Sequence, residues 1–345
     1  MKKKVGVIDV GSNSLRLLIA RSLEDKLQVI RRELVETRLG EGLSPGKELH
    51  LLARKRTLEA FSAFQKILLA ERVEDALVVS TSAVREARDG DSFLTEMAKS
   101  SPFPVQLLSP EEEAYWSFKG ALQGLKMFFL AAGSGEGKAG AVSRRAAFSK
   151  IEVDPLNLEQ WIVLDLGGRS TELAWLEKEK FMYQSFPFGA VRLHEKFNAP
   201  LSNFTRRAAE DSREAPAQIK VQVKEYLKEM MSCVNTFRPF WQERELVAVG
   251  GTVTTLAAVA QQLQVYSPEA VHGYVLEKVE AERWEKIFYS SSLAEKRALL
   301  PFAPLRADII AAGTSSLVAV MDFLGKEQLL VSEEGLLLGL LEKLS

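Results

Sequence analysis

The sequence predicts an α/β protein built from two similar lobes, and three observations support this. The chain has 345 residues, of which 46% are hydrophobic, which is enough for a large core and for two domains. Its first part carries short apolar strands, followed by strands that alternate with amphipathic helices. A strand-turn-strand segment near the N-terminus recurs about halfway along the chain, and such a duplication predicts two lobes with a ligand in the cleft between them.

The first lobe begins with three short apolar runs separated by turns too short to hold a helix. They predict a three-stranded antiparallel meander over residues 5–35. Apolar residues then recur at helical spacing over residues 56–73, and a strand over 76–81, a helix around 92–100 and a strand over 105–109 follow. This order predicts a mixed sheet that binds its ligand at the ends of the parallel strands.

The duplicated turn carries residues that suit a phosphate group. "VIDVGSNSLRLL" and "VLDLGGRSTELA" share an aspartate at the strand end, a glycine two residues later and a serine three residues after that. Glycine lets backbone N–H groups approach an anion, and the short polar side chains add donors. The aspartate would repel phosphate unless a divalent cation lies between them. The alternative is a hairpin turn whose Asp and Asn bond their own backbone, but the repetition favours the phosphate site.

A helix that begins near residue 110 is a candidate source of a general base. Ser109 suits the N-cap position and Glu112 lies three residues later, which completes a capping box. Glu111 and Glu112 therefore have a structural explanation at the helix N-terminus. Glu113 is not needed for the cap, so its carboxylate can project into the cleft and activate water.

Two further segments are candidate anion sites. Arg85 follows a predicted strand and a Ser/Thr-rich turn, where its guanidinium can bind phosphate in a bidentate manner. The alternative for Arg85 is a surface ion pair with Glu86 or Asp89. The segment "LVAVGGTVTTLAAVA" predicts a strand, a turn and a helix whose first N–H groups favour anions, with Gly250, Gly251 and Thr252 in the turn.

The composition excludes several classes of protein. Lys and Arg number 45 against 46 Asp and Glu, so no global field attracts nucleic acid or an anionic membrane. No stretch approaches the ~20 apolar residues of a membrane span. The single cysteine, Cys233, suits a reducing cytoplasm, and His50, His194 and His272 lack the spacing of a histidine metal site. We therefore expect a cytoplasmic protein with neither nucleic acid nor a membrane as its partner.

Taken together, these segments resemble the exopolyphosphatase and guanosine pentaphosphate phosphohydrolase family, often written Ppx/GppA, in its short two-domain form. The resemblance rests on "VIDVGSNSLRLLIAR", "STSAVREARDGDSF", "LLSPEEEAYWSFKGAL", "VLDLGGRSTEL", "FPFGAVRLHEKF", "VGGTVTTLAAV", "RADIIAAG" and "VSEEGLLLGLL", which together span nearly the whole chain. It implies an actin-like, ribonuclease-H-like duplicated fold, in which two lobes with mixed five-stranded sheets flanked by helices enclose a central cleft. We expect one lobe over residues 1–124 and 332–345 and the other over 125–331, with a flexible insertion at about 131–158.

The resemblance also implies an activity, which is the Mg²⁺-assisted hydrolysis of a terminal phosphoanhydride in polyphosphate or guanosine pentaphosphate. By this resemblance, Glu113 is the catalytic glutamate that activates water, Glu172 is a second acid near that water, and Arg85 grips phosphate. Asp9 and Asp165 would organise the metal. The turns that cradle phosphate would comprise Gly11, Ser12, Asn13 and Ser14, then Gly167, Gly168, Arg169, Ser170 and Thr171, with the turn at Gly250 as a further anion site.

The chain departs from the family pattern in the second phosphate turn, where the family usually has three glycines. Here Gly167 and Gly168 are followed by Arg169. This arginine has three interpretations, which are a solvent-facing turn residue, an extra phosphate clamp, or an obstruction if the position needs positive φ or close backbone approach.

A second departure lies near the C-terminus, where the family pattern "SDxGLREG" reads "SEEGLLLG". Glu333 stands for aspartate, and Leu337 and Leu338 replace an arginine and a glutamate, which predicts an altered ligand pocket or lobe contact. The sequence ends at Ser345, before the helical domains with which longer members hold extended polyphosphate. The resemblance therefore does not extend processive hydrolysis of long chains to this sequence.

Three functions are open at this point. The leading one is a phosphoanhydride hydrolase. The second is a degenerate member that binds a nucleotide or an alarmone, such as guanosine tetraphosphate, as a sensor with little hydrolysis. The third is a kinase of the same superfamily, which needs an acceptor pocket. Polyphosphate and guanosine pentaphosphate both present the reactive bond, so both are candidate substrates, and a homodimer is the default expectation.

Overall fold

The computed structural model describes residues 3–23, 26–43, 46–133, 157–197, 207–231 and 241–344. The chain divides into two compact units, the first comprising Met1–Gly120 and Leu336–Ser345 and the second Ala121–Gly335. Helix α4 (Pro110–Gly133) begins in the first unit and continues into the second. The sequence predicts the two boundaries between the units at 124/125 and 331/332, whereas the structure has them after Gly120 and after Gly335.

The first unit contains a five-stranded sheet in the order β3-β2-β1-β4-β5. β1 (Lys4–Val10), β2 (Ser14–Leu23) and β3 (Lys26–Glu36) pair antiparallel, so the predicted meander is confirmed. β4 (Asp75–Ser80) and β5 (Val105–Leu107) add parallel strands to the β1 edge. The sheet is therefore mixed, as the order of apolar segments predicts.

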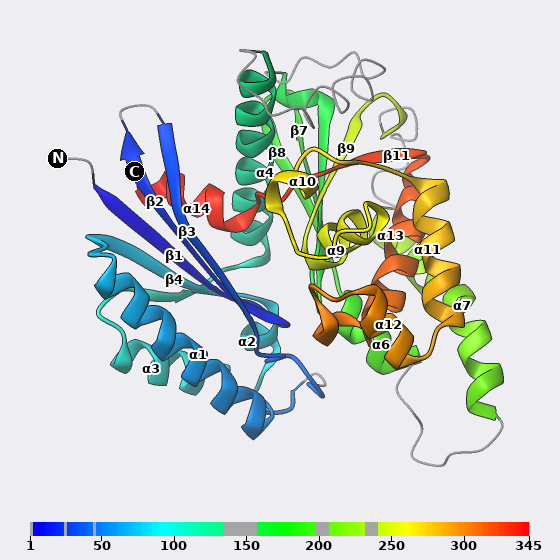
Figure 1. Cartoon of the computed structure of the whole chain (residues 1–345), viewed down its shortest axis with the longest axis horizontal. Helices are drawn as coiled ribbons and strands as arrows, with labels where there is room; N and C mark the ends of the chain where they lie inside the picture. Colours follow the sequence, from blue (N-terminus) through cyan, green and yellow to red (C-terminus); the bar gives the residue numbers. More distant parts are fainter. Residues whose placement is uncertain are drawn as a thin grey trace. The chain divides into compact units, whose positions relative to one another are not determined.

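Helices cover both faces of this first sheet. α1 (Leu51–Ala70) and α3 (Gly90–Ser100) lie on one face, and α14 (Leu336–Leu344) lies on the other (Figure 1). Alternate residues of β1 serve the two faces, because Ile8 and Val10 join one core cluster and Val5 and Val7 join the other. Asp9 follows the alternation and lies on the face of Val5 and Val7.

The second unit repeats this arrangement. Its sheet has the order β10-β11-β9-β6-β7-β8, in which β6 (Trp161–Leu166), β7 (Thr171–Glu177) and β8 (Lys180–Phe186) form an antiparallel meander. β9 (Glu245–Val249) and β11 (Gln328–Val331) extend it in parallel. The second sheet has one strand more than predicted, because β10 (Val275–Glu277) pairs antiparallel with β11 at its edge. The predicted duplicated α/β fold is confirmed.

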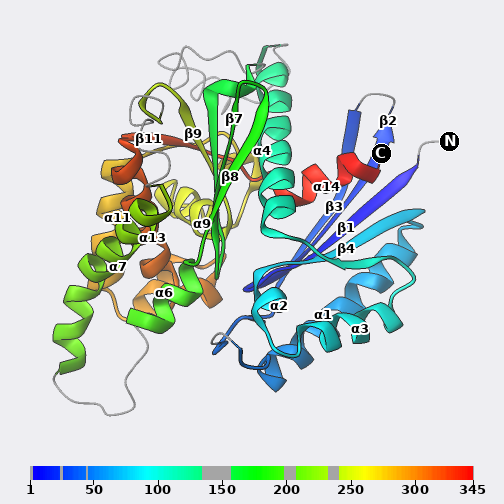
Figure 2. The same ribbon diagram turned by 180° about the vertical axis from the view of Figure 1, so that it is seen from behind.

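Helices of the second unit pack around one large apolar core. α13 (Ile310–Leu324) is buried on almost every side and contacts α6, α7, α9 and α11. Figure 2 shows α6 below the end of β8 from which the chain enters it, opposite the turn that joins β7 to β8. The other elements are α6 (Ala190–Phe197), α7 (Arg207–Met231), α9 (Gly251–Ala260), α10 (Pro268–Val271), α11 (Lys278–Ser290), α12 (Leu293–Leu299), and the 3-10 turns η1 (Leu158–Gln160) and η3 (Pro304–Arg306).

The insertion predicted at 131–158 falls largely outside the described residues. Its first three positions belong to α4, which ends at Gly133, and Asn157 caps η1 by accepting a hydrogen bond from the N–H of Glu159. Residues 134–156 are not described. Among the helices that are described, none is both long enough and apolar enough to cross a membrane.

Candidate active site

The first turn (residues 11–14) closes the hairpin between β1 and β2. The N–H of Gly11 donates to the carbonyl of Ser14 at 3.1 Å. A Cβ on Gly11 would lie 2.9 Å from that carbonyl oxygen, which is closer than a side chain tolerates. Asp9, which is 7% exposed, lies one residue before the closing pair Val10–Leu15. The hairpin therefore fixes a nearly buried carboxylate beside a turn that only glycine can begin.

The second turn (residues 167–170) has the same geometry. The N–H of Gly167 donates to the carbonyl of Ser170 at 3.1 Å, and a Cβ on Gly167 would lie 2.7 Å from that oxygen. Asp165 lies one residue before the closing pair Leu166–Thr171. The repeat seen in the sequence is thus also a repeat of backbone structure.

A segment that the sequence reasoning missed holds the first turn in place. Residues 37–43 follow β3, and the N–H groups of Arg38 and Gly40 donate to the carbonyls of Asn13 and Ser12 at 2.9 and 2.7 Å. In a trans peptide the C=O and the next N–H point in opposite directions. The N–H groups of Asn13 and Ser14 are therefore directed to the opposite side of the turn, as an anion cradle requires.

Helix α6 holds the second turn instead. The N–H of Ala190 donates to the carbonyl of Gly167 at 3.1 Å, and Val191 and Arg192 both donate to that of Gly168, at 2.8 and 3.1 Å. Gly189 is required for this approach, because its Cβ would lie 2.5 Å from the carbonyl carbon of Gly168. The first amides of α6 are thus used by the turn itself, and the N–H groups of Gly168 and Arg169 are directed to the other side.

Within the first unit, the structure brings Arg85 and Glu113 together. Nη1 of Arg85 donates to Oε2 of Glu113 at 3.2 Å and to the carbonyl of Leu108 at 2.8 Å. Glu113 is 9% exposed. Arg85 comes from α2 (Ser82–Glu86), a short helix that the sequence reasoning missed, and the buried hydroxyl of Ser82 lies 2.9 Å from that of Ser12. Helix α2 therefore contacts the first turn through Ser82 and Glu113 through Arg85.

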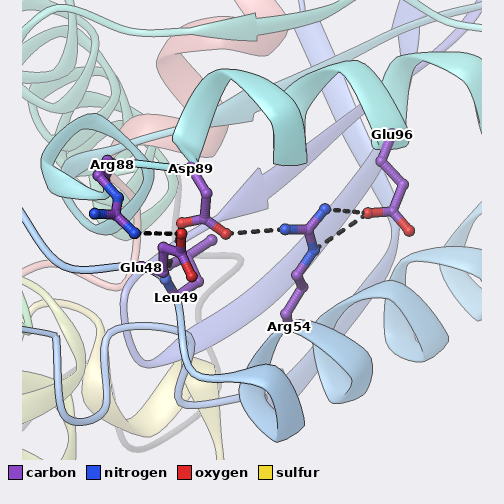
Figure 3. A network of polar contacts seen from close by, with 6 residues as sticks. All are labelled: Glu48, Leu49, Arg54, Arg88, Asp89 and Glu96. Carbon is purple, nitrogen blue, oxygen red and sulfur yellow. Dashed lines mark hydrogen bonds and ion pairs between the residues drawn. The ribbon is translucent and has the colours of Figure 1, made fainter.

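The alternative for Arg85, a surface ion pair with Glu86 or Asp89, is wrong. Asp89 instead accepts hydrogen bonds from Nη1 of Arg54 and from the N–H of Leu49, both at 2.9 Å (Figure 3). These contacts tie the start of α3 to the start of α1. Asp89 therefore stabilises the fold near the site and leaves Arg85 to Glu113.

The capping box at the start of α4 is present in both directions. The N–H of Glu112 donates to the hydroxyl of Ser109 at 3.1 Å, and the N–H of Ser109 donates to Oε2 of Glu112 at 2.9 Å. The structural explanation for Glu112 is therefore confirmed. Glu111 and Glu112 are exposed, whereas Glu113 is buried, so the three adjacent acids have different environments.

In the second unit, Asp165 and Glu172 lie directly opposite one another on β6 and β7. Directly opposed residues of an antiparallel pair share a face of the sheet, and like charges there are unfavourable. Glu172 is 2% exposed, and Oε1 of Glu172 accepts a hydrogen bond from the hydroxyl of Ser185 on β8 at 2.8 Å. Ser185 is a further residue at this site that the sequence reasoning missed.

Arg169 is buried, with 1% of its surface exposed, and Nη1 of its guanidinium lies 3.4 Å from Oε2 of Glu195 on α6. The solvent-facing interpretation is therefore wrong. Arg169 is also not among the residues of the described chain with positive φ, so its backbone is not in the region that glycine alone favours. Obstruction through a required positive φ is therefore excluded for Arg169. The interpretation of Arg169 as a phosphate clamp stays a prediction.

The turn at Gly250 leads from β9 into α9, as predicted. Gly250 has φ of 104°, and a Cβ there would collide with the carbonyl oxygen of Leu166. A Cβ on Gly251 would collide with the guanidinium of Arg306, which is 8% exposed. Thr252 is buried in the first turn of α9. Arg306 was missed as a site residue, although its segment "RADIIAAG" carries part of the resemblance.

The departure at "SEEGLLLG" divides between two environments. Glu333 accepts a short hydrogen bond from the hydroxyl of Tyr266, and burial first, then the charge of Glu333, raises the pKa of Tyr266. Leu338 is 2% exposed and joins the core cluster of Val5 and Val7, against which Leu337 also packs. At these two positions, the charges of the family pattern are therefore replaced by core packing.

The duplicated fold, with a carboxylate before a glycine turn in each unit, defines a two-unit α/β protein with a repeated hairpin. The family model described as "Ppx/GppA phosphatase family" matches residues 18–132 and 146–344. The chain therefore belongs to the Ppx/GppA phosphatase family.

Two curated relatives match over almost the whole chain. Exopolyphosphatase 2 of Mycobacterium tuberculosis is 28% identical over 350 residues, covering 98% of this chain and 97% of that protein. The bifunctional 3-dehydroquinate synthase/phosphatase of Fusobacterium nucleatum is 27% identical over 344 residues, which are 96% of this chain. The chain spans 45% of the length of that relative.

Solved structures share the fold. An exopolyphosphatase from Cytophaga hutchinsonii gives a TM-score of 0.79 at 23% identity, covering 99% of this chain and 97% of the other. The Aquifex aeolicus member of the Ppx/GppA family gives 0.71 at 24% identity, with 99% and 97% covered.

Proposed function

We propose that the protein hydrolyses the terminal phosphoanhydride of inorganic polyphosphate or guanosine pentaphosphate, with Glu113 as the general base. The observation that carries this proposal is the environment of Glu113, a buried carboxylate in the first turn of α4 that is paired with Arg85. The Mycobacterium tuberculosis relative, 97% of which is matched by this chain, is named an exopolyphosphatase. A relative from Vibrio cholerae, which matches 48% of this chain, is named guanosine-5'-triphosphate,3'-diphosphate pyrophosphatase.

The chemistry needs a base, donors for phosphoryl oxygens and neutralisation of charge. A water oxygen attacks the terminal phosphorus, the bond from that phosphorus to the bridging oxygen breaks, and the water proton passes to Glu113. The leaving group is the shortened polyphosphate or guanosine tetraphosphate. Backbone N–H groups of the first turn would bind phosphoryl oxygens, and Arg85 of the same unit would bind an oxygen pair.

The oxygen donors of each unit are of the kind that Mg²⁺ prefers. Each unit offers an aspartate at the strand end before its turn, Asp9 and Asp165, and a hard oxygen donor is what Mg²⁺ prefers. The described residues contain no group of three or more His, Cys, Asp or Glu arranged to hold a metal, so phosphate and water oxygens would complete the shell. When bound, the ion would neutralise charge on the phosphoryl oxygens. Calorimetric titration of MgCl₂ should show weaker binding to Asp9→Asn than to the wild type, independently of activity.

Orthophosphate release tests the proposal. We expect the wild type with Mg²⁺ to release orthophosphate from polyphosphate, from guanosine pentaphosphate, or from both when assayed in parallel. Glu113→Gln should reduce kcat by about 10² to 10⁴, the usual contribution of a general base. Glu111→Gln is the matched control, because Glu111 lies on the same turn but is exposed. A wild type that binds guanosine tetraphosphate yet releases no phosphate would contradict the proposal in favour of a sensor.

A further inference from the structure

We propose that Arg85 is a positioning residue for Glu113, in addition to any contact it makes with phosphate. The Nη1 nitrogen of its guanidinium holds the base and keeps it ionised, while the Nε and Nη2 groups are left to bind an anionic oxygen pair. This inference rests on the proposed function and deepens it, because it assigns to one arginine the relative placement of base and phosphoryl group.

The first step is the attachment of Arg85 itself. α2 begins with three buried residues, Ser82, Ala83 and Val84, and the N–H of Arg85 donates to the carbonyl of Thr81 at 3.1 Å. The hydroxyl of Ser82 meets that of Ser12 in the first turn. Arg85 thus belongs to the same short helix that contacts the first turn, so the position of its Cα is fixed relative to that turn.

The second step is the double contact at Nη1. This nitrogen carries two hydrogens, and it donates one bond to the carbonyl of Leu108 and another to Oε2 of Glu113. Leu108 immediately precedes Ser109, the N-cap of α4. Arg85 therefore binds both the backbone before the helix and the carboxylate one turn into it. The hydrogen bond to the carbonyl of Leu108 orients Nη1 of Arg85 toward Glu113. Rotation of the Glu113 side chain would break its own bond to this nitrogen.

The third step concerns charge. Glu113 is 9% exposed, and a carboxylate with so little water around it is ionised most readily beside an opposite charge. Glu111 and Glu112 beside it on α4 are acidic and exposed, and Glu86 of α2 is acidic as well. Of the charged residues on α14, which packs against α4, Lys343 lies over the ring of Trp116. Acidic neighbours disfavour the anion. Arg85 is the cation seen in an ion pair with Glu113.

The fourth step is the free edge of the guanidinium. In the described chain, Nε and Nη2 of Arg85 donate no hydrogen bond, and the side chain keeps 22% of its surface exposed. Nε and Nη2 form the side-on edge that binds carboxylate or phosphate in a bidentate manner. A phosphoryl group on this edge would stand at a fixed offset from Glu113, because both are held by one rigid planar group.

Kinetics and titration together test this assignment. We will compare Arg85→Lys and Arg85→Ala, with Arg88→Ala as control, because Arg88 lies three residues on and pairs with Glu48 at the surface. Arg85→Ala should reduce kcat at least tenfold and move the acid limb of the kcat profile about one pH unit or more toward higher pH. Arg85→Lys should keep the acid limb near the wild-type position, because the ammonium group keeps the positive charge. KM should rise, because the ammonium group cannot bind two phosphate oxygens in a bidentate manner. Arg88→Ala should match the wild type.

A second measurement does not depend on catalysis. With ¹³C-labelled glutamate, the Glu113 carboxyl signal is assigned by its absence in Glu113→Gln and titrated in each variant. A midpoint that rises in Arg85→Ala and returns in Arg85→Lys supports the positioning role even if the protein proves to hydrolyse nothing. Circular dichroism confirms that each variant is folded. An Arg85→Ala variant in which only KM rises, with both the acid limb and the carboxyl titration unchanged, would overturn the inference.

Discussion

The two hairpin turns share one backbone geometry but differ in what surrounds it. Both close with a 3.1 Å hydrogen bond from glycine to serine, and both would reject a Cβ on that glycine. The first is held by loop amides of Arg38 and Gly40, the second by the first amides of α6. The anchored carbonyls are shifted by one peptide between the two turns, so the outward amides are also shifted. A duplicated scaffold therefore directs different backbone amides outward in its two turns.

The charges across the two hairpins also differ. Asp9 lies opposite Arg16 in the first ladder, whereas Asp165 lies opposite Glu172 in the second. Opposite charges at such positions are favourable and like charges are unfavourable. The first hairpin is thus neutral across its ladder, and the second has two acids that a cation would stabilise.

The largest expected effect breaks the second turn while leaving the first intact. In Gly189→Ala, the new Cβ would lie 2.5 to 2.7 Å from three backbone atoms of residues 167–169. We expect a loss of about 2–3 kcal/mol in the free energy of unfolding, because backbone cannot yield as a flexible side chain can. Urea denaturation measures it. Gly335→Ala is the matched control, since its Cβ would make ordinary contacts of 3.5 Å with Val249, and equal stability of the two variants would contradict the geometry.

Arg169→Gly tests what the second turn gained from its arginine. Removal of this buried guanidinium leaves Glu195, whose side chain is 31% exposed, without that partner, so we expect a loss of about 1–2 kcal/mol. Glu195→Gln and the double variant complete a cycle that should show coupling of about 1 kcal/mol. Orthophosphate release should fall if Arg169 also clamps phosphate. Unchanged stability in Arg169→Gly would exclude the brace between the turn and α6.

The smallest effect has opposite signs in the two hairpins. Without Mg²⁺, Asp9→Asn should destabilise the protein and Asp165→Asn should stabilise it, each by about 0.2–1 kcal/mol, because one removes an attraction across the ladder and the other a repulsion. Thermal melts in EDTA measure both changes. With Mg²⁺ added, the wild type should gain stability over Asp165→Asn if the ion binds the native state. Shifts of the same sign in EDTA would show that the opposing residues do not set the difference.

Local patterns were sufficient to predict much of this molecule. The first meander, the paired turns and the Ser109–Glu112 box depend on residues close together in the sequence, and spacing alone identifies them. The contact of Arg85 with Glu113 and the packing of Arg306 against Gly251 join distant segments, so no short pattern contains them. Gly189 was a visible signal for close backbone approach. Its partner in the second turn could be identified only from the structure.

The use of α6 to hold the second turn also makes the turn observable. The first amides of a helix normally lack partners in the helix and exchange their protons quickly. Those of Ala190, Val191 and Arg192 are instead bonded to the carbonyls of Gly167 and Gly168. Their hydrogen-exchange rates therefore report directly on the integrity of the second turn, while Arg38 and Gly40 report on the first. If phosphate slows exchange at only one of these two sets of amides, the turn held by that set is the one that binds phosphate.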